Sequence, residues 1–218
     1  MIFSGRNLVK YPYSRYGYTR GGGKTWHGGI DVCGIDDDKI RMPGYNGKSI
    51  AGTVVTARIV TNKSNKTWEW GYYICVKLDA NQTPDAVNYL YFCHCSKLLA
   101  SVGQKVKTGD VLAVVGQTGN AAGTWTHCHF EVRATATSKG LDPSAYAAIP
   151  NNAGIYGTAP AAEKPVEVPV SSNEKTAVSA LQNITVGPVS SGDAAAVVAV
   201  CKEHGTAADS YTNAENHL

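Results

Sequence analysis

Short runs of β-branched and aromatic residues, alternating with polar residues, dominate the chain before residue 150. Glycines interrupt these runs at short intervals, and hardly any segment shows the 3.6-residue periodicity of a helix. Alternation sends successive side chains to opposite faces of a strand, so each run predicts a half-buried strand. The runs lie at 48–60, 72–78, 88–95, 111–116 and 126–134. We therefore expect a mostly β domain with hairpin connections and no long helix.

The composition changes at Pro150. Four of the nine prolines follow within 150–169, among Ala, Glu, Val and Ser. This predicts three parts: a folded domain over 1–149, a Pro/Ala-rich linker over 150–178, and a small α/β segment over 179–218. About 40 residues rarely bury a core alone, so we expect the last segment to associate with itself or to bind another surface.

Charge divides along the same boundary. Residues 1–150 hold 17 Lys and Arg against 10 Asp and Glu, whereas the rest hold 3 against 7. A modestly basic domain favours an anionic target. The sequence has no Lys/Arg stripe of the kind that would indicate binding to nucleic acid. No stretch approaches the roughly 20 apolar residues of a membrane span, and the N-terminus lacks the apolar core of a secretory signal. We expect a chain made in a cytoplasm, with no membrane partner and with reduced cysteines.

Histidines form the densest chemical pattern. His127 and His129 are two residues apart in a predicted strand, so both face the same side, while Cys128 and Phe130 face the other. His27 and Asp31 are four residues apart in a glycine-rich segment, and His94 lies in another predicted strand. Imidazole and carboxylate suit Zn²⁺, and three protein ligands with an open position are typical of catalytic zinc. Separate structural histidines are the alternative, which the joint pattern disfavours.

The cysteines are competing zinc ligands. Cys128 is expected to face away from its two neighbouring histidines. Cys93 and Cys95 flank His94 and should point away from the side to which His94 points. We therefore expect these thiols to enter the core as small apolar groups.

These motifs resemble the M23 zinc metallopeptidases, the LytM or lysostaphin-like family. The resemblance covers about 16–146 and rests on motifs in the family's order. They are His27-Gly28-Gly29-Ile30-Asp31, Tyr91-Phe92-Cys93-His94, Gly103 to Asp110, Gly116-Gln117-Thr118-Gly119 and His127-Cys128-His129-Phe130-Glu131, with Asp142-Pro143 after them. Cys95 and Cys128 stand where the family usually has Leu, and we expect this to alter core packing only.

The resemblance implies a small antiparallel β-sheet with a groove, and endopeptidase cleavage of peptidoglycan stem and bridge peptides. It implies that His27, Asp31 and His129 bind Zn²⁺. His94 and His127 look like the catalytic pair, with His127 as general base and His94 in transition-state stabilisation and proton shuttling. Tyr18 is the candidate for a tyrosine near the oxyanion; a packing role for it is equally open. Trp26 and Trp125 either wall the groove or pack in the core or rim.

A wall hydrolase with no secretory signal resembles a bacteriophage endolysin, which is made in the host cytoplasm and acts on the cell wall after release. The C-terminal segment would then bind the wall or self-associate. Two alternatives are a LytM-type module without catalysis, which binds or activates other hydrolases, and a virion-associated tail hydrolase. The complete set of five histidine and aspartate residues disfavours the first.

Overall fold

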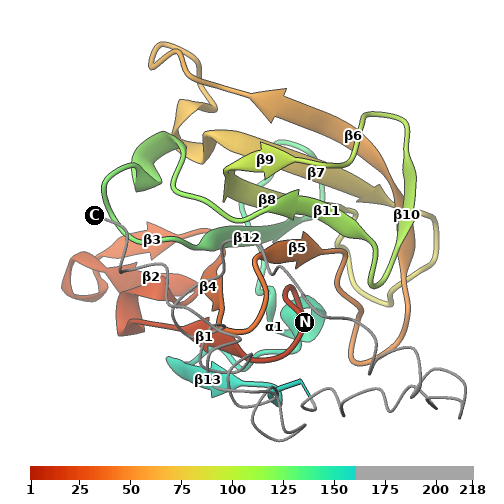
Figure 1. The fold of residues 1–218 in the computed structure, drawn as a ribbon, viewed down its shortest axis with the longest axis horizontal. Coiled ribbons are helices and arrows are strands. Elements are labelled where there is room, and N and C mark those ends of the chain that lie inside the picture. Colours follow the sequence, from red (N-terminus) through yellow and green to blue (C-terminus); the bar gives the residue numbers. More distant parts are fainter. Residues whose placement is uncertain (161–218) are drawn as a thin grey trace, which may run out of the picture. The chain divides into compact units, whose positions relative to one another are not determined.

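The structure is a computed structural model that describes residues 1–160; the expected C-terminal segment, 179–218, and most of the expected linker lie outside these residues. Short strands are the main regular elements of the described fold (Figure 1). The elements, with η for 3-10 helices, are β1 (Asn7–Val9), η1 (Pro12–Ser14), β2 (Gly17–Arg20), η2 (Gly21–Gly23), β3 (Thr25–His27), β4 (Ile30–Gly34), β5 (Lys39–Arg41), β6 (Ala51–Ile59), η3 (Trp68–Trp70), β7 (Tyr72–Leu78), β8 (Tyr89–Cys95), β9 (Lys97–Leu98), β10 (Lys105–Lys107), β11 (Val111–Val114), η4 (Gly119–Ala121), β12 (Cys128–Arg133), α1 (Ser144–Ala147) and β13 (Gly154–Tyr156).

Three antiparallel sheets form the domain. The largest has the strand order β10-β6-β7-β8-β12-β4-β1-β13, and β12 lies near its middle, between β8 and β4 (Figure 1). A second sheet has the order β5-β11-β9, and β2 and β3 form a hairpin. Each of the five runs predicted as strands contains one, and the mostly β class with an antiparallel sheet is confirmed. The strands before residue 42 were not predicted from the sequence.

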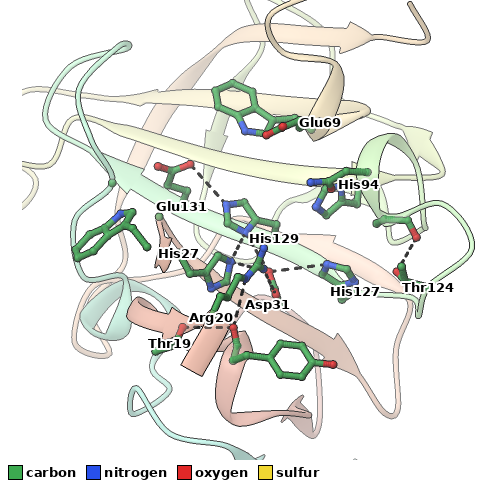
Figure 2. Close-up of a pocket in the computed structure, with 18 of the residues that line it drawn as sticks. Thr19, Arg20, His27, Asp31, Glu69, His94, Thr124, His127, His129 and Glu131 are labelled. Carbon is green, nitrogen blue, oxygen red and sulfur yellow. Dashed lines mark hydrogen bonds and ion pairs between the residues drawn. The ribbon is translucent and has the colours of Figure 1, made fainter. Parts of the chain in front are cut away.

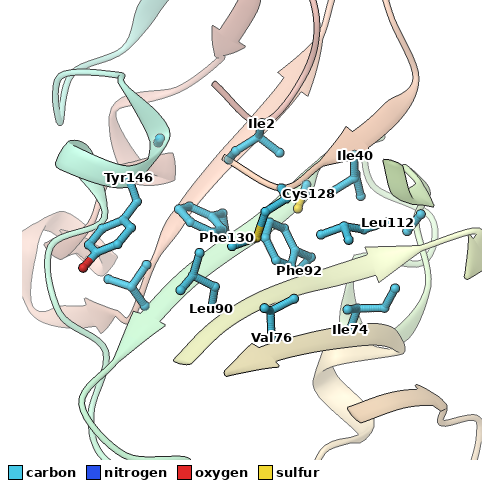
Figure 3. Close-up of a cluster of buried hydrophobic side chains, with 14 of the residues drawn as sticks. Ile2, Ile40, Ile74, Val76, Leu90, Phe92, Leu112, Cys128, Phe130 and Tyr146 are labelled. Atoms are coloured by element: carbon cyan, nitrogen blue, oxygen red, sulfur yellow. The ribbon is translucent and has the colours of Figure 1, made fainter. Parts of the chain in front are cut away.

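The main core lies on one face of the large sheet. Alternate side chains of β8 and β12 enter it, with the Phe92 and Phe130 ring centroids 5.2 Å apart (Figure 3). Leu112 of β11 and Tyr146 of α1 join this cluster. Because the pleat sends neighbouring residues to opposite faces, the other face of β12 is left for polar groups.

The folded domain extends past the expected boundary at 149. Strand β13 pairs with β1, with Ile155 opposite Leu8, so the first residues of the expected linker contain a strand of the large sheet. The only α-helix of residues 1–160 is α1, with four residues, and none of the described helices is long and apolar enough to cross a membrane.

Candidate metal centre

An open cavity of about 900 Å³ lies over the polar face of β12. Three side chains of this strand line it and alternate with three that enter the core. The three that line it are His129, Glu131 and Arg133. The expected groove is therefore a product of strand alternation: one face of β12 builds the core and the other builds the site.

His27 and Asp31 reach the cavity from the end of β3 and from β4. Asp31 lies directly opposite His129 in the β4–β12 ladder, which brings their side chains together. The turn between the strands runs tightly against β12: a Cβ atom on Gly29 would lie 2.2 Å from the carbonyl oxygen of Phe130. Only glycine fits there, so the glycine-rich segment is what allows His27 to approach His129.

Three donor atoms converge at this point (Figure 2). His27 Nε2 lies 2.9 Å from His129 Nδ1, and Asp31 Oδ1 lies 3.1 Å from the first and 3.0 Å from the second. All three residues are buried. Two imidazole nitrogens and one carboxylate oxygen that face one point match the donor set of a catalytic zinc site with an open position. The residues present therefore fit the metal that the sequence predicted.

Backbone carbonyl groups fix the tautomers of three histidines. Nδ1 of His27 lies 2.8 Å from the Arg15 carbonyl oxygen. Nδ1 of His94 lies 2.9 Å from the Thr118 carbonyl oxygen, and Nδ1 of His127 lies 2.8 Å from that of Trp125. A carbonyl oxygen only accepts, so each Nδ1 donates, and each neutral ring keeps its lone pair at Nε2. The Nε2 lone pair of His27 faces the cluster of three donor atoms.

The other two rings lie beside the cluster and are not part of it. His127 Nε2 lies 3.8 Å from Asp31 Oδ1, and the His94 ring centroid lies 4.9 Å from that of His127 and 6.0 Å from that of His129. Both rings line the cavity (Figure 2). The structure therefore divides the five predicted residues into three convergent donors and two rings with free Nε2 lone pairs.

His94 reaches the cavity through a β-bulge. Between the pairs Ile74–Phe92 and Tyr72–Cys95, strand β7 has one residue and β8 has two. The extra residue, His94, has a left-handed backbone with φ of 65°. Such a bulge reverses the alternation of the strand. Cys95 consequently enters the main core, and His94 turns to the cavity side.

The bulge corrects one expectation. Cys95 and Cys128 enter the main core as predicted, but Cys93 does not. Cys93 lies opposite His129 in the β8–β12 ladder and is buried in a second cluster with Tyr73 and Tyr91. Strict alternation around His94 gave the wrong side for Cys93 because the bulge adds a residue to the strand. Burial raises the pKa of Cys95 to about 12 and also raises the pKa values of Cys93 and Cys128, so these thiols stay protonated.

Two ion pairs hold the cluster from outside. Arg20 donates from Nη2 to Asp31 Oδ2 at 2.8 Å, which leaves Oδ1 to face the histidines. On the other side, His129 Nε2 lies 3.6 Å from Glu131 Oε2. Neither Arg20 nor Glu131 was predicted from the sequence to contact the three donor residues. Glu131 could have been found there, because it lies two residues from His129 on the same strand face.

Electrostatics separate the histidines into two groups. Burial opposes a charge on His129, but its contacts with Asp31 and Glu131 raise its pKa to about 9. Burial, followed by the neighbouring His129 and His127, lowers the pKa of His94 to about 3. Burial also lowers the pKa of His127. The two rings beside the cluster are thus neutral at pH 7 and able to accept a proton.

Aromatic residues surround the site. Trp26 and Trp125 both line the cavity, and the Trp125 ring stacks on that of His127 with centroids 4.2 Å apart. Tyr18 does not line it: the residue is 63% exposed, and its ring packs edge-on against Trp26. Tyr13 lies at the cavity instead. The family resemblance suggested Tyr18 as the tyrosine near the oxyanion; its contact with Trp26 fits the packing role that was left open for it.

Residues 42–143 match the model of the family described as Peptidase family M23. This span includes His94, His127 and His129, whereas His27 and Asp31 precede it. Among solved structures, the chain resembles the catalytic domain of the antimicrobial peptidase lysostaphin from Staphylococcus simulans, at 24% identity over 60% of this chain and 86% of that one, with a TM-score of 0.43. It resembles a variant catalytic domain of the prophage-encoded M23 protein EnpA from Enterococcus faecalis, at 24% identity over 64% and 91%, with a TM-score of 0.46. It also resembles a chain of the SpoIIIAH and SpoIIQ complex, at 20% identity over 66% and 95%, with a TM-score of 0.45.

Proposed function

We propose that the chain is a zinc-dependent endopeptidase of the M23 type that cleaves peptide cross-links in bacterial peptidoglycan. The observation that carries the proposal is the convergence of His27 Nε2, Asp31 Oδ1 and His129 Nδ1 beside two neutral histidines in an open cavity. The match of residues 42–143 to Peptidase family M23 supports it independently of His27 and Asp31.

In this proposal His27, Asp31 and His129 hold Zn²⁺. Zinc so bound acidifies a water molecule and polarises the scissile carbonyl group. Arg20 keeps Asp31 turned toward the cluster through its bond to Oδ2. The opening of the cavity gives an extended peptide access to this point.

His127 is the general base of the proposal. Its Nδ1–H is held by the Trp125 carbonyl oxygen, and its Nε2 lone pair faces the donor cluster. A ring fixed in this way accepts a proton from the attacking water at Nε2. The stacked Trp125 ring limits rotation of the imidazole and keeps that lone pair aimed.

His94 is proposed to shuttle the proton. Its Nδ1–H is committed to the Thr118 carbonyl oxygen, so the neutral ring has no proton at Nε2 to give. It must first accept one, which the adjacent His127 ring can supply, and then pass it to the leaving amine or the developing oxyanion. The low pKa of His94 favours rapid release of that proton.

The natural target is the stem or bridge peptide of peptidoglycan. We propose that the chain serves as a bacteriophage lysin, made in the host cytoplasm and acting on the wall after release, and that the segment at 179–218 binds the wall or self-associates. No nucleic-acid or membrane partner is expected. The basic residues of the domain suit an anionic envelope.

Wall digestion tests this function. Purified sacculi from several Gram-positive species would be incubated with the wild type and with His127→Ala, each with and without a chelator. Mass spectrometry would then identify new amino termini. We expect termini that require both His127 and metal, and their sequence names the bond that is cut.

Two results would contradict the proposal. Sacculi that yield no new termini although the protein binds zinc would favour the non-catalytic wall-binding module. Termini that form equally in the presence of chelator would show a hydrolase without zinc. Recovery of an active protein in purified virions would reassign it to the tail hydrolases.

A further inference from the structure

Glu131 is a buried carboxylate that the proposed chemistry does not use. It lies on β12, two residues after His129, and its side chain is 5% exposed. Burying a charged carboxylate is costly unless partners compensate it. The partners of Glu131 therefore indicate what its charge does.

Arg133 is the first partner. Its Nε lies 3.0 Å from Glu131 Oε1 and its Nη2 lies 3.1 Å from Oε2, so the guanidinium group binds both oxygens. The guanidinium carbon lies 4.9 Å from the ring centroid of Trp70 and 5.0 Å from that of Tyr91. Such a bidentate pair fixes the plane of the carboxylate. Arg133 is itself fixed by the two rings.

Two glycines hold Glu131 on the other side. A Cβ atom on Gly28 would lie 2.8 Å from Glu131 Oε1, and one on Gly140 would lie 2.5 Å from the same oxygen. The carboxylate thus occupies a slot in which neither neighbour has room for a side chain. A group confined in this way has little freedom to turn away from its second partner.

His129 is that second partner. Its Nε2 lies 3.6 Å from Glu131 Oε2 (Figure 2). The tautomers of His27, His94 and His127 are fixed by backbone carbonyl oxygens. His129 differs: within residues 1–160, the acceptor beside its Nε2 is the Glu131 carboxylate. A proton held at Nε2 leaves the lone pair at Nδ1, which is the atom that faces His27 and Asp31.

We infer that Glu131, clamped by Arg133, is a positioning residue that orients His129 and selects the tautomer whose Nδ1 lone pair binds the metal. The inference rests on the proposed zinc function. Carboxylates that contact a ligand histidine in this way affect metal affinity without touching the metal.

The test measures zinc affinity directly, by competition with a chromophoric chelator, for the wild type and for Glu131→Ala, Glu131→Gln and Arg133→Met. Glu69→Ala is the matched control, because Glu69 is a carboxylate that lines the same cavity and, within residues 1–160, makes no hydrogen bond or ion pair with a histidine. We expect Glu131→Ala to weaken zinc binding about 10- to 100-fold. Glu131→Gln should lose less, because its amide oxygen can still lie beside Nε2–H, and Glu69→Ala should match the wild type.

A second readout separates orientation from simple support of the fold. The visible spectrum of the Co²⁺-loaded protein reports ligand geometry, and we expect Glu131→Ala to change it while Glu69→Ala does not. Adding Arg133→Met to Glu131→Ala should not weaken zinc binding further, because Arg133 acts on His129 through the Glu131 carboxylate.

Each outcome is decisive. If Glu131→Ala and Glu131→Gln bind zinc as tightly as Glu69→Ala, the inference is overturned, even if the metal-free variants are less stable. If Glu131→Ala fails to fold, the isosteric Glu131→Gln carries the test. A wild type that binds no zinc would instead overturn the proposed function.

Discussion

His27 Nε2 lies 2.9 Å from His129 Nδ1, although the first atom belongs to a ring whose proton is held at Nδ1 by the Arg15 carbonyl oxygen. Two lone pairs at this distance repel unless a proton or a cation lies between them. In the metal-free protein a proton on His129 lies between them. Burial opposes this charge, but Asp31 and Glu131 outweigh burial and raise the pKa of His129 to about 9. Zinc has to take the place of that proton.

Zinc binding at pH 7 should therefore release about one proton. Titration calorimetry in buffers of different ionisation enthalpy measures this number. His129→Ala should lose both the binding and the release. Zinc binding in the wild type with no buffer dependence would show that His129 is already neutral.

Zinc should also stabilise the fold, since the three donors converge only in the native chain. At a free concentration 1,000 times its dissociation constant, the free energy of unfolding should rise by about 4 kcal/mol. Thermal or urea denaturation with and without zinc measures the change. Mg²⁺ prefers oxygen ligands in an octahedral arrangement and should have no such effect; equal stabilisation by both ions would contradict the site.

His127→Ala should lower the cleavage rate about 10²- to 10⁴-fold through loss of the general base. Its zinc affinity should be nearly that of the wild type, because His127 Nε2 lies outside the three-donor cluster. Initial rates on purified sacculi and chelator competition give the two quantities. A variant that loses zinc along with activity would make His127 a ligand.

Buried His94 should make the metal-free protein sensitive to acid. Burial, then its histidine neighbours, lowers the His94 pKa from 6.5 to about 3. The unfolded chain therefore binds the proton first, so this contribution to stability is complete above pH 6.5 and falls as the pH drops toward 3. Urea denaturation of chelated wild type and His94→Gln over pH 3–7 should show a shallower decline in the variant. Parallel declines would place the acid sensitivity elsewhere.

Tyr18→Phe should leave the cleavage rate near that of the wild type, because the Tyr18 side chain is largely exposed and does not line the cavity. Tyr13→Phe changes a tyrosine that does line it and is the matched comparison. Steady-state rates on one sacculus preparation compare the two. A large loss in Tyr18→Phe alone would restore the catalytic role that the sequence suggested for it.

Much of the fold followed from alternation, because β7, β8, β11 and β12 lie in runs whose pattern is unambiguous. The set of His27, Asp31 and His129 was predicted from the family resemblance, whereas strand alternation placed only His127 and His129 on one face. The side of Cys93 was not predicted correctly, since a bulge depends on how β7 and β8 pair and not on β8 alone. Tyr18 lies outside the cavity lining, because proximity in sequence does not fix where a hairpin points a side chain.

The bulge in β8 also gives His94 a different position from His129 relative to the three donor atoms, although both residues are histidines. In a regular ladder, the residue of β8 directly across from His129 is Cys93, and a histidine there would sit as close as a fourth ligand. The bulge places His94 one step along the strand from Cys93, outside the three-donor cluster yet still on the cavity wall. Chain length within β8 therefore matters as much as residue identity. A β8 strand shortened by one residue at Cys93 would place His94 opposite His129, where it would compete for the open position of the metal centre that we propose.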